Sequence, residues 1–303
     1  MKIAIIGYTS ILARSLIEEL KQRDYELVFF GRITDVPNAE KFEIPAYPLK
    51  VSQLLNMDWV FYLAGSGVQP DDRSAHNELY EVNCYEPLRV VTELSLSQYK
   101  GNFVSFGSYF EIGDVKNRQT FNEEEIVFSE YPSLNIYSQS KRLLSRFLHD
   151  FTLKKTGFRN FHFYLPNIFD PQENTKRLIP YVIGAIRRGD EVKLSGGEQI
   201  RQYIYTKDIA EFLIQFMTMN KVDPGLYCLT SDEPCTIKMI VEEVVKTAVD
   251  SGLYVPKIIF NAAKTKDAHA PYLLLNDTKA REELSWKPKV TVAKMLNKYF
   301  ELY

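Results

Sequence analysis

Cysteine and histidine are scarce in this chain, which has three cysteines and four histidines among 303 residues. The cysteines are odd in number and far apart, a pattern that excludes a disulfide framework and suits a reducing compartment. No histidine lies at ligand spacing from a cysteine, so we expect no metal site. The residues concerned are Cys84, Cys228, Cys235, His76, His149, His162 and His269.

A strong charge and a long apolar run are also missing. The 37 basic and 39 acidic residues leave a net charge of −2, and no basic stripe interleaved with aromatic residues is present. This balance gives no electrostatic reason to expect nucleic acid or an anionic membrane as a partner. No apolar run approaches the ~18 residues of a membrane span, and no signal peptide is recognisable. We therefore expect a soluble, cytoplasmic protein.

Glycine is missing from the turn where it is most expected. Lys2–Ile6 is a short apolar run typical of a buried parallel strand, and apolar residues recur at helical spacing over 12–20. In dinucleotide-binding proteins such a strand-to-helix turn carries three glycines. Here only Gly7 remains, with Ser10 and Ala13 in the other two places.

Each of these three positions has its own function. Gly7 keeps the tight turn, Ser10 places a small hydroxyl where the backbone approaches the pyrophosphate, and Ala13 adds one methyl group where the helix packs on the strand. The phosphates are bound mainly by N–H groups at the helix start, which no side chain removes. The turn therefore still predicts dinucleotide binding, and a strand–turn–helix that binds nothing is the alternative.

Strands and helices alternate through the first half of the chain. We expect strands at 25–31, 58–64, 102–106 and 158–165, and helices at 79–99 and 137–156. Such alternation indicates an α/β fold with a doubly wound parallel sheet, the Rossmann architecture. After residue 165, loops and short helices indicate a smaller α/β substrate-binding lobe. The expected division is 1–165 and 203–222 for the dinucleotide-binding domain, and 166–202 and 223–303 for the substrate lobe.

Three side chains are candidates for catalysis. Tyr137 and Lys141 lie four residues apart on one helical face in YSQSKRLLSRFL. A tyrosine with a pKa near ~10 is a poor acid or base at neutral pH, and an ammonium one turn away would lower that pKa. Ser108 follows a strand at the edge where such sheets bind ligands, and its hydroxyl can donate to a carbonyl oxygen that gains charge. The alternatives are an exposed lysine beside an aromatic ring and an ordinary turn serine.

Taken together, these motifs resemble the extended short-chain dehydrogenases/reductases that act on nucleotide sugars. The resemblance runs almost from end to end: GYTSILA matches the glycine turn, YLAGSG the segment under the cofactor, SFGSYFEIGD the segment of the catalytic serine, and YSQSK the tyrosine–lysine motif. Nearly fifty residues from LPNIFDP to IAEFL are similar to the core of the substrate lobe, and LSWKPKVTV to the C-terminal signature.

The resemblance implies a role for each matching residue. Tyr137 would be the acid/base, Lys141 would bond the nicotinamide ribose and Ser108 would hold the sugar carbonyl. The implied cofactor-binding residues are Gly7, Thr9, Ser10, Ile11, Leu12, Arg32, Leu63, Ala64, Gly65, Asn83, Tyr137, Lys141 and Pro166. The implied substrate-binding residues are Ser108, Tyr109, Asn167, Arg177, Leu178, Lys193 and Arg201. Among them, Asn167 and Arg201 would contact the nucleotide diphosphate, and Arg177 and Leu178 would line its base and ribose.

Three departures from the family pattern narrow the chemistry. Dehydratases of this family carry an Asp-Glu pair directly after the catalytic serine or threonine, where this chain has Tyr109-Phe110, and Glu111 comes one residue too late. The place of the second proton-transfer group of epimerase-reductases holds Gln172. The Arg-x-Gly-Asp phosphate clamp is replaced by KDAHA, residues 266–270.

Plain hydride transfer remains, and the chain is most similar to the 4-ketoreductases that finish 6-deoxy or dideoxy sugars, such as CDP-abequose synthase. We expect a CDP- or dTDP-linked 4-keto sugar as the substrate. A C4 epimerase with retained NAD and a non-catalytic dinucleotide-sensing regulator are the alternatives.

The end of the second strand indicates the cofactor. In FFGR, Gly31 and Arg32 stand where NAD-specific relatives place an acid for the ribose 2′-hydroxyl. A guanidinium suits a 2′-phosphate, so we expect NADP(H). Asp35 lies farther along the loop. The resemblance also implies a homodimer, in which helices 79–99 and 137–156 pair with their symmetry mates.

Overall fold

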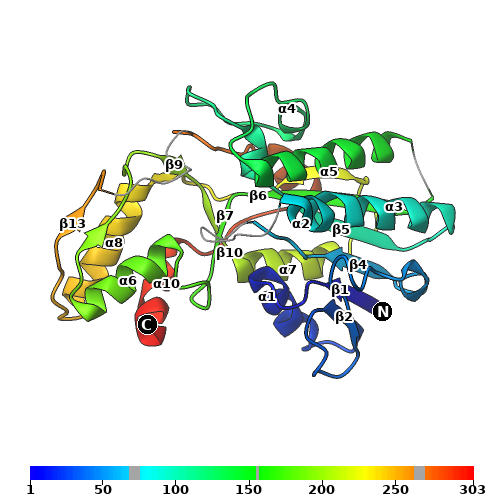
Figure 1. Ribbon diagram of the computed structural model, residues 1–303, viewed down its shortest axis with the longest axis horizontal. Coiled ribbons are helices and arrows are strands. Elements are labelled where there is room, and N and C mark those ends of the chain that lie inside the picture. Colours follow the sequence, from blue (N-terminus) through cyan, green and yellow to red (C-terminus); the bar gives the residue numbers. More distant parts are fainter. Residues whose placement is uncertain (68–75, 155–156, 263–269) are drawn as a thin grey trace.

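The central feature of the computed structural model is a seven-stranded parallel sheet (Figure 1). The structure describes residues 1–67, 76–154, 157–262 and 270–303. The strand order is β11-β6-β5-β4-β1-β2-β3. These strands are β1 (Lys2–Ile6), β2 (Glu26–Gly31), β3 (Ala39–Lys41), β4 (Trp59–Tyr62), β5 (Asn102–Ser108), β6 (Arg159–Leu165) and β11 (Gly225–Cys228). The predicted Rossmann fold is confirmed, and the order reverses between β1 and β4, where such sheets bind ligands.

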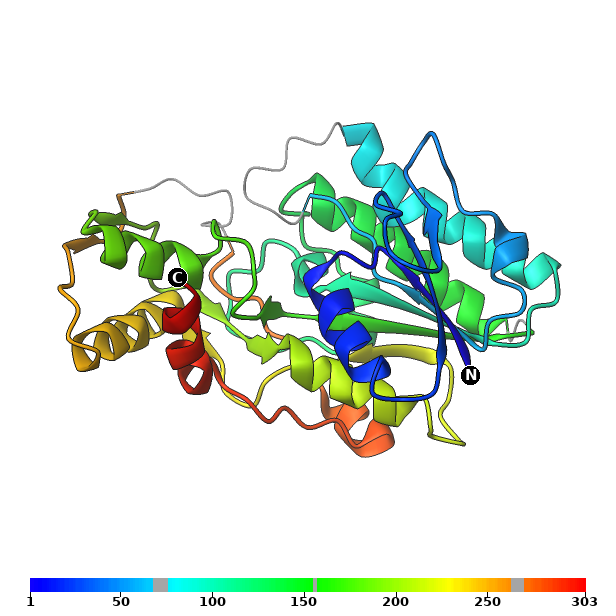
Figure 2. The ribbon, with the colours of Figure 1, turned by 90° about the horizontal axis from the view of Figure 1, so that it is seen from below.

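Helices cover both faces of this sheet because its strands are apolar on both sides. In β1, Ile3 and Ile5 pack into one core and Ala4 and Ile6 into the other, as the period of two in a strand requires. The first core lies under α1 (Ile11–Leu20) and α7 (Thr206–Phe216), and the second under α3 (Glu86–Leu96) and α5 (Ile136–Leu153). Figures 1 and 2 show the two helix layers on opposite sides of the sheet.

The helix predicted over 79–99 is divided into three parts. It consists of α2 (His76–Tyr80), the π-helix η2 (Glu81–Tyr85) and α3. The predicted helix is therefore confirmed over residues 79–96, and only its π-turn was not foreseen, because apolar spacing does not reveal a change from i→i+4 to i→i+5 hydrogen bonding. The π-turn places the fully buried Asn83 against the sheet.

A second group of elements lies at the other end of the molecule (Figure 2). It contains α6 (Leu178–Arg188), α8 (Ile237–Asp250), α10 (Val292–Leu302), β8 (Val192–Lys193) and β13 (Ile258–Ile259), which share a core of their own. Two further strand pairs, β7 (Asn167–Phe169) with β10 (Tyr203–Tyr205) and β9 (Ile200–Arg201) with β12 (Cys235–Thr236), complete the pairing. The division expected from the sequence places residues 223–303 in this lobe, whereas β11 pairs with β6 in the large sheet.

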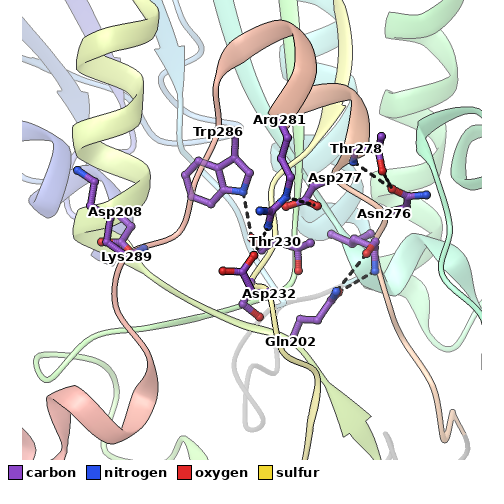
Figure 3. Close-up of polar contacts among 12 residues, drawn as sticks. Gln202, Asp208, Thr230, Asp232, Asn276, Asp277, Thr278, Arg281, Trp286 and Lys289 are labelled. Carbon is purple, nitrogen blue, oxygen red and sulfur yellow. Dashed lines mark hydrogen bonds and ion pairs between the residues drawn. The ribbon is translucent and has the colours of Figure 1, made fainter.

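Polar contacts attach the C-terminal signature to α7 and to the segment that follows β11 (Figure 3). The indole N–H of Trp286 donates to the carbonyl of Thr230 at 3.0 Å. The buried carboxylate of Asp208 accepts from the backbone N–H groups of Lys289 and Val290 at 2.7 and 2.9 Å. These bonds position the chain between α9 (Thr278–Leu284) and α10. The remaining short elements are η1 (Val51–Gln53), η3 (Tyr109–Ile112) and α4 (Glu123–Val127). None of the helices in the described ranges is long and apolar enough to cross a membrane.

Candidate active site

The glycine-poor turn makes a close backbone contact with the neighbouring strand end. Gly7 adopts a φ of +79°, a conformation that side chains other than glycine's rarely take. A Cβ on Gly7 would lie 2.5 Å from both the N and the Cα of Ala64, which follows β4. Gly7 therefore brings the turn against the point where the strand order reverses.

The start of α1 presents free donors beside this turn. Ser10 is the N-cap, and its hydroxyl oxygen accepts from the N–H of Ala13 at 3.3 Å, which leaves the hydroxyl proton available for a ligand. The N–H groups of Ile11 and Leu12 have no partner within the helix. Thr9 is exposed next to them. These residues fit a dinucleotide pyrophosphate, because donors and the positive helix end point to one place.

Asn83 holds the segment that follows β4. Its amide oxygen accepts from the N–H of Ser66 at 2.9 Å, and its amide nitrogen donates to the Ser66 carbonyl and the Ser140 hydroxyl. Gly65 lies beside this amide, with 3.6 Å between its ideal Cβ position and the amide oxygen. The other two implied cofactor residues at these strand ends, Leu63 and Pro166, are buried.

Ser108, Tyr137 and Lys141 meet at the carboxyl end of β5. Ser108 is the last residue of β5 and the N-cap of η3, and Tyr137 lies in the first turn of α5, which Asn135 caps. The ammonium of Lys141 donates to the carbonyl of Phe106 at 2.9 Å and is 8% exposed. The three candidate catalytic groups therefore share one corner of the sheet.

The charges in this corner differ from the sequence-based expectation. Burial raises the pKa of Tyr137, and the Ser108 hydroxyl, as a hydrogen-bond partner, lowers it. The ammonium of Lys141 donates to the Phe106 carbonyl. Burial also lowers the pKa of Lys141, and the carboxylate of Glu111 raises it. Tyr137 therefore keeps its proton at neutral pH.

Aromatic rings surround Tyr137. The Phe110 ring lies 6.2 Å from the Tyr137 ring, centroid to centroid, at an interplanar angle of 82°. Tyr109 is buried, and its hydroxyl donates to the side-chain oxygen of Asn167 at 2.9 Å. The position where dehydratases carry a second proton-transfer group thus holds an apolar ring.

The implied substrate-binding cations have different surroundings. Arg177 is half-buried, pairs with Glu173 at 3.0 Å, and lies near enough to Tyr137 to lower its pKa. Leu178 follows it at the start of α6. Arg201 is 4% exposed and donates to the backbone carbonyls of Ile200, Ala270 and Pro271.

Two further parts of the expected substrate site remain to be located. Lys193 is exposed on β8 with Glu191 at 3.8 Å. Of the segment that replaces the phosphate clamp, residues 266–269 lie outside the described residues.

The ring of Tyr8 fills the space beside Gly31. A Cβ on Gly31 would lie 2.8 Å from the ring of Tyr8, whose hydroxyl donates to the carbonyl of Ile33 at 2.8 Å. Arg32 is exposed beside this ring. Burial raises the pKa of Tyr8, and the charge of nearby Asp35 raises it further.

Sequence reasoning missed the buried groups behind Ser108. Glu111 accepts from the Ser108 N–H, and Ser145 connects its carboxylate to His162. The available signal was polar residues at apolar positions, namely a serine on the apolar face of helix 137–156 and a histidine inside the strand 158–165.

Comparison with known proteins first gives a sequence family that covers most of the chain. Residues 3–228 match the sequence model of the NAD dependent epimerase/dehydratase family.

Three similar solved structures share the fold over 100% of this chain. MoeE5 in complex with UDP-glucuronic acid and NAD has 17% identity, a TM-score of 0.81 and 98% of its chain covered. The dTDP-glucose 4,6-dehydratase of Bacillus anthracis in complex with NAD has 16% identity and a TM-score of 0.79, with 96% of its chain covered. The UDP-glucuronic acid 4-epimerase of Bacillus cereus in complex with UDP-glucuronic acid and NAD has 15% identity and a TM-score of 0.80, with 98% of its chain covered.

The contact between Gly7 and Ala64 gives a stability prediction with a matched control. Gly252 has a similar φ of +74°, but a Cβ there meets nothing within 4 Å. We expect Gly252→Ala to lower the free energy of unfolding by about 1–2 kcal/mol, the cost of a left-handed alanine. Gly7→Ala should cost more, since it also separates the turn from β4. Urea unfolding of both variants measures the difference, and equal losses would contradict the contact.

Proposed function

The chain belongs to the NAD dependent epimerase/dehydratase family, and we propose that it is an NADPH-dependent reductase of a nucleotide-linked 4-keto-6-deoxy or dideoxy sugar at C4. Such a reduction serves deoxysugar biosynthesis for surface polysaccharide. The observation that supports it most is the corner around Tyr137, which combines one protonated phenol with the apolar ring of Phe110. Reduction of a ketone needs one acid, whereas dehydration needs an additional acid and base.

The residues of this corner suit the reduction step by step. The Ser108 hydroxyl donates to the ketone oxygen, where negative charge develops. Tyr137 then gives its proton to that oxygen, and its raised pKa keeps the proton in place until then. Lys141 would bond the nicotinamide ribose. The reduced nicotinamide, when bound, supplies the hydride.

The carboxylate of Glu111, which lies near this corner, does not act as a base in this proposal. Glu111 is fully buried, and both of its oxygens are occupied by the Ser108 N–H and the Ser145 hydroxyl. Gln172, in the other place for a proton-transfer group, has no ionisable side chain. Because neither Glu111 nor Gln172 can serve as a second proton-transfer group, a net reduction is favoured over dehydration or epimerisation.

The proposed substrate is a CDP- or dTDP-linked sugar. Similar structures contain UDP-sugars, which supports a nucleotide sugar of some kind. The family resemblance assigns Arg177 to the base and ribose of the nucleotide. A role of Arg201 at the diphosphate requires that its bonds to the Ala270 and Pro271 carbonyls be exchanged for bonds to the ligand.

The proposed cofactor is NADP(H). Any side chain in place of Gly31 would displace the ring of Tyr8, so the acid that binds the ribose in NAD-specific relatives cannot stand there. The exposed guanidinium of Arg32 is free to meet a 2′-phosphate.

A C4 epimerase with retained NAD is the second candidate. The proximity of Asp35 to Tyr8 favours it, since a carboxylate at this place could accept from the ribose hydroxyl. The similar structures listed above also contain NAD. A regulator without activity is the weaker alternative because Ser108, Tyr137 and Lys141 are all present.

We also propose a homodimer through α3 and α5. Leu96 on α3 and Leu143 on α5 are 79% and 50% exposed, and Tyr85 at the end of η2 is 50% exposed. Apolar side chains exposed on two adjacent helices are typical of an interface.

The reductase predicts stoichiometric consumption of NADPH. A panel of CDP-, dTDP- and GDP-linked 4-keto-6-deoxy sugars is incubated with NADPH, and the products are identified by NMR. We expect one NADPH oxidised for each sugar, with the CDP- or dTDP-linked compound preferred. No oxidation of NADPH with any of these keto sugars would contradict the reductase.

The catalytic roles predict graded losses. Tyr137→Phe removes the acid and should lower kcat by about 10²–10⁴-fold. Ser108→Ala removes one donor to the developing charge and should cost about 10²–10³-fold. Tyr131→Phe deletes the same hydroxyl from an exposed tyrosine outside this corner and should leave kcat unchanged. Full activity of Tyr137→Phe would refute the mechanism.

Cofactor choice is tested at the end of β2. Arg32→Ala should weaken NADPH binding much more than NADH binding, because only NADPH carries the 2′-phosphate. Asp35→Ala is the matched variant and should leave NADPH affinity unchanged. Both are measured by fluorescence titration. Equal losses for the two cofactors in Arg32→Ala, or a selective loss of NADH in Asp35→Ala, would favour the NAD-binding alternative.

The proposed interface is tested by introducing a glutamate at an exposed apolar residue in each lobe. Light scattering at micromolar concentration should report a dimer for the unchanged protein and a monomer for Leu143→Glu. Val249→Glu on α8, also at an exposed apolar residue (58% exposed), should remain a dimer. A monomeric unchanged protein would contradict the proposal.

A further inference from the structure

A continuous chain of buried polar groups lies behind Ser108 and Lys141. The Oε1 atom of Glu111 accepts from the Ser108 N–H at 2.7 Å, and its Oε2 atom accepts from the Ser145 hydroxyl at 2.5 Å. The Ser145 Oγ lies 3.0 Å from the Nε2 of His162, whose Nδ1 lies 2.8 Å from the Oγ of Ser105. The chain thus connects η3, α5, β6 and β5, the elements that carry or flank the candidate catalytic residues.

The hydrogen bonds of this chain have one consistent direction. Burial and the charge of Lys141 lower the pKa of His162 to about 3, so its ring is neutral, with one donor and one acceptor nitrogen. Since Ser145 donates to the carboxylate, it accepts from the Nε2–H of His162, and Ser105 donates to Nδ1. This direction requires Glu111 to be ionised.

Gly107 makes room for the chain. A Cβ at this residue would lie 2.5 Å from the Nε2 of His162 and 2.8 Å from the Oε1 of Glu111. The chain therefore contacts the backbone of β5 between Phe106, whose carbonyl holds Lys141, and Ser108. Packing this tight leaves the carboxylate little freedom to move.

The titratable groups near Lys141 and Glu111 come from four elements, η3, η2, β6 and α5. Lys141 faces Glu111 on η3, Cys84 on η2 and the neutral His162 on β6. Burial lowers the pKa of Lys141, and the Glu111 carboxylate raises it. Burial raises the pKa of Glu111 to about 7, against the opposing effects of its hydrogen bonds and of Lys141 and Arg142. Glu111 also faces the phenols of Tyr137 and Tyr164.

We propose that Glu111 is a positioning residue of this site, whose carboxylate fixes the backbone of Ser108 and supplies the negative charge that keeps Lys141 an ammonium. This inference rests on the proposed function, in which Lys141 bonds the ribose of the nicotinamide cofactor. A carboxylate that only capped η3 would need a hydrogen-bond acceptor and no charge. The two roles can therefore be separated by experiment.

Glu111→Gln removes the charge and can retain the hydrogen bonds. The amide oxygen accepts from the Ser108 N–H, and the amide N–H donates to Ser145, which then donates to His162 in its other tautomer. The matched control is Glu123→Gln. Glu123 is also buried, accepts from the backbone N–H of Cys228 at 2.6 Å, and faces Lys279 in place of Lys141.

The measurement is the dissociation constant of NADPH as a function of pH, read by fluorescence, with melting temperatures as a check of folding. Below the pKa of Glu111 the wild type and Glu111→Gln should agree, because the carboxyl is then neutral in both. At higher pH the loss of affinity should occur about 1–3 pH units lower in Glu111→Gln, the range for removal of a neighbouring opposite charge. Glu123→Gln should follow the wild type.

A third variant provides a graded series and a substitute if Glu111→Gln does not fold. Glu111→Asp withdraws the carboxylate by one methylene, so its loss of affinity should begin between those of the wild type and Glu111→Gln. If every variant that folds has the same pH dependence of NADPH affinity as the wild type, the inference is overturned while the proposed function stands. A wild-type chain that binds no nicotinamide cofactor would overturn the proposed function and this inference with it.

Discussion

The ammonium of Lys141 rests on the carbonyl of Phe106, and this buried bond joins α5 to the end of β5. This bond fixes the positions of residues on both β5 and α5. Ser108 follows two residues later on the strand, and Tyr137 precedes by one helical turn, so one contact sets the distance between two groups far apart in sequence. Burial of an ammonium is costly unless an opposite charge compensates it. Glu111 is the carboxylate in reach, and the buried chain of Ser145 and His162 holds it in place. The shape of the site and its charge therefore depend on each other.

This arrangement favours donation of a proton over its removal. A phenol whose pKa is raised by burial is a poor base at neutral pH but holds the proton that a reduced ketone needs. The Phe110 ring beside it adds no second proton carrier. Just after β2, Arg32 and Asp35 point to different cofactors, so the direction of the chemistry and the choice of cofactor are separate questions on this scaffold.

Much of the fold could be predicted from the sequence, because apolar runs and helical spacing are local signals. The strands near residues 25–31, 102–106 and 158–165 and the helix from residue 137 are examples. The π-turn around Asn83 and the edge strands β3 and β11 could not be predicted, since they depend on hydrogen-bond shifts and on pairing with distant strands.

Tyr137 and Lys141 were found from their spacing of four residues on one helical face, and Ser108 from its place after a predicted strand. The direction of the Lys141 side chain, the Tyr8 ring over Gly31 and the buried position of Glu111 depend on packing, which spacing alone does not encode.

Isotope transfer tests the central claim, a net reduction at C4, most directly. The protein is incubated with a nucleotide-linked 4-keto sugar and NADPH that carries deuterium at C4 of its nicotinamide, and the product is examined by NMR and mass spectrometry. The account predicts one deuterium at C4 of each product sugar. A product alcohol at C4 that contains no deuterium from the added cofactor would contradict it.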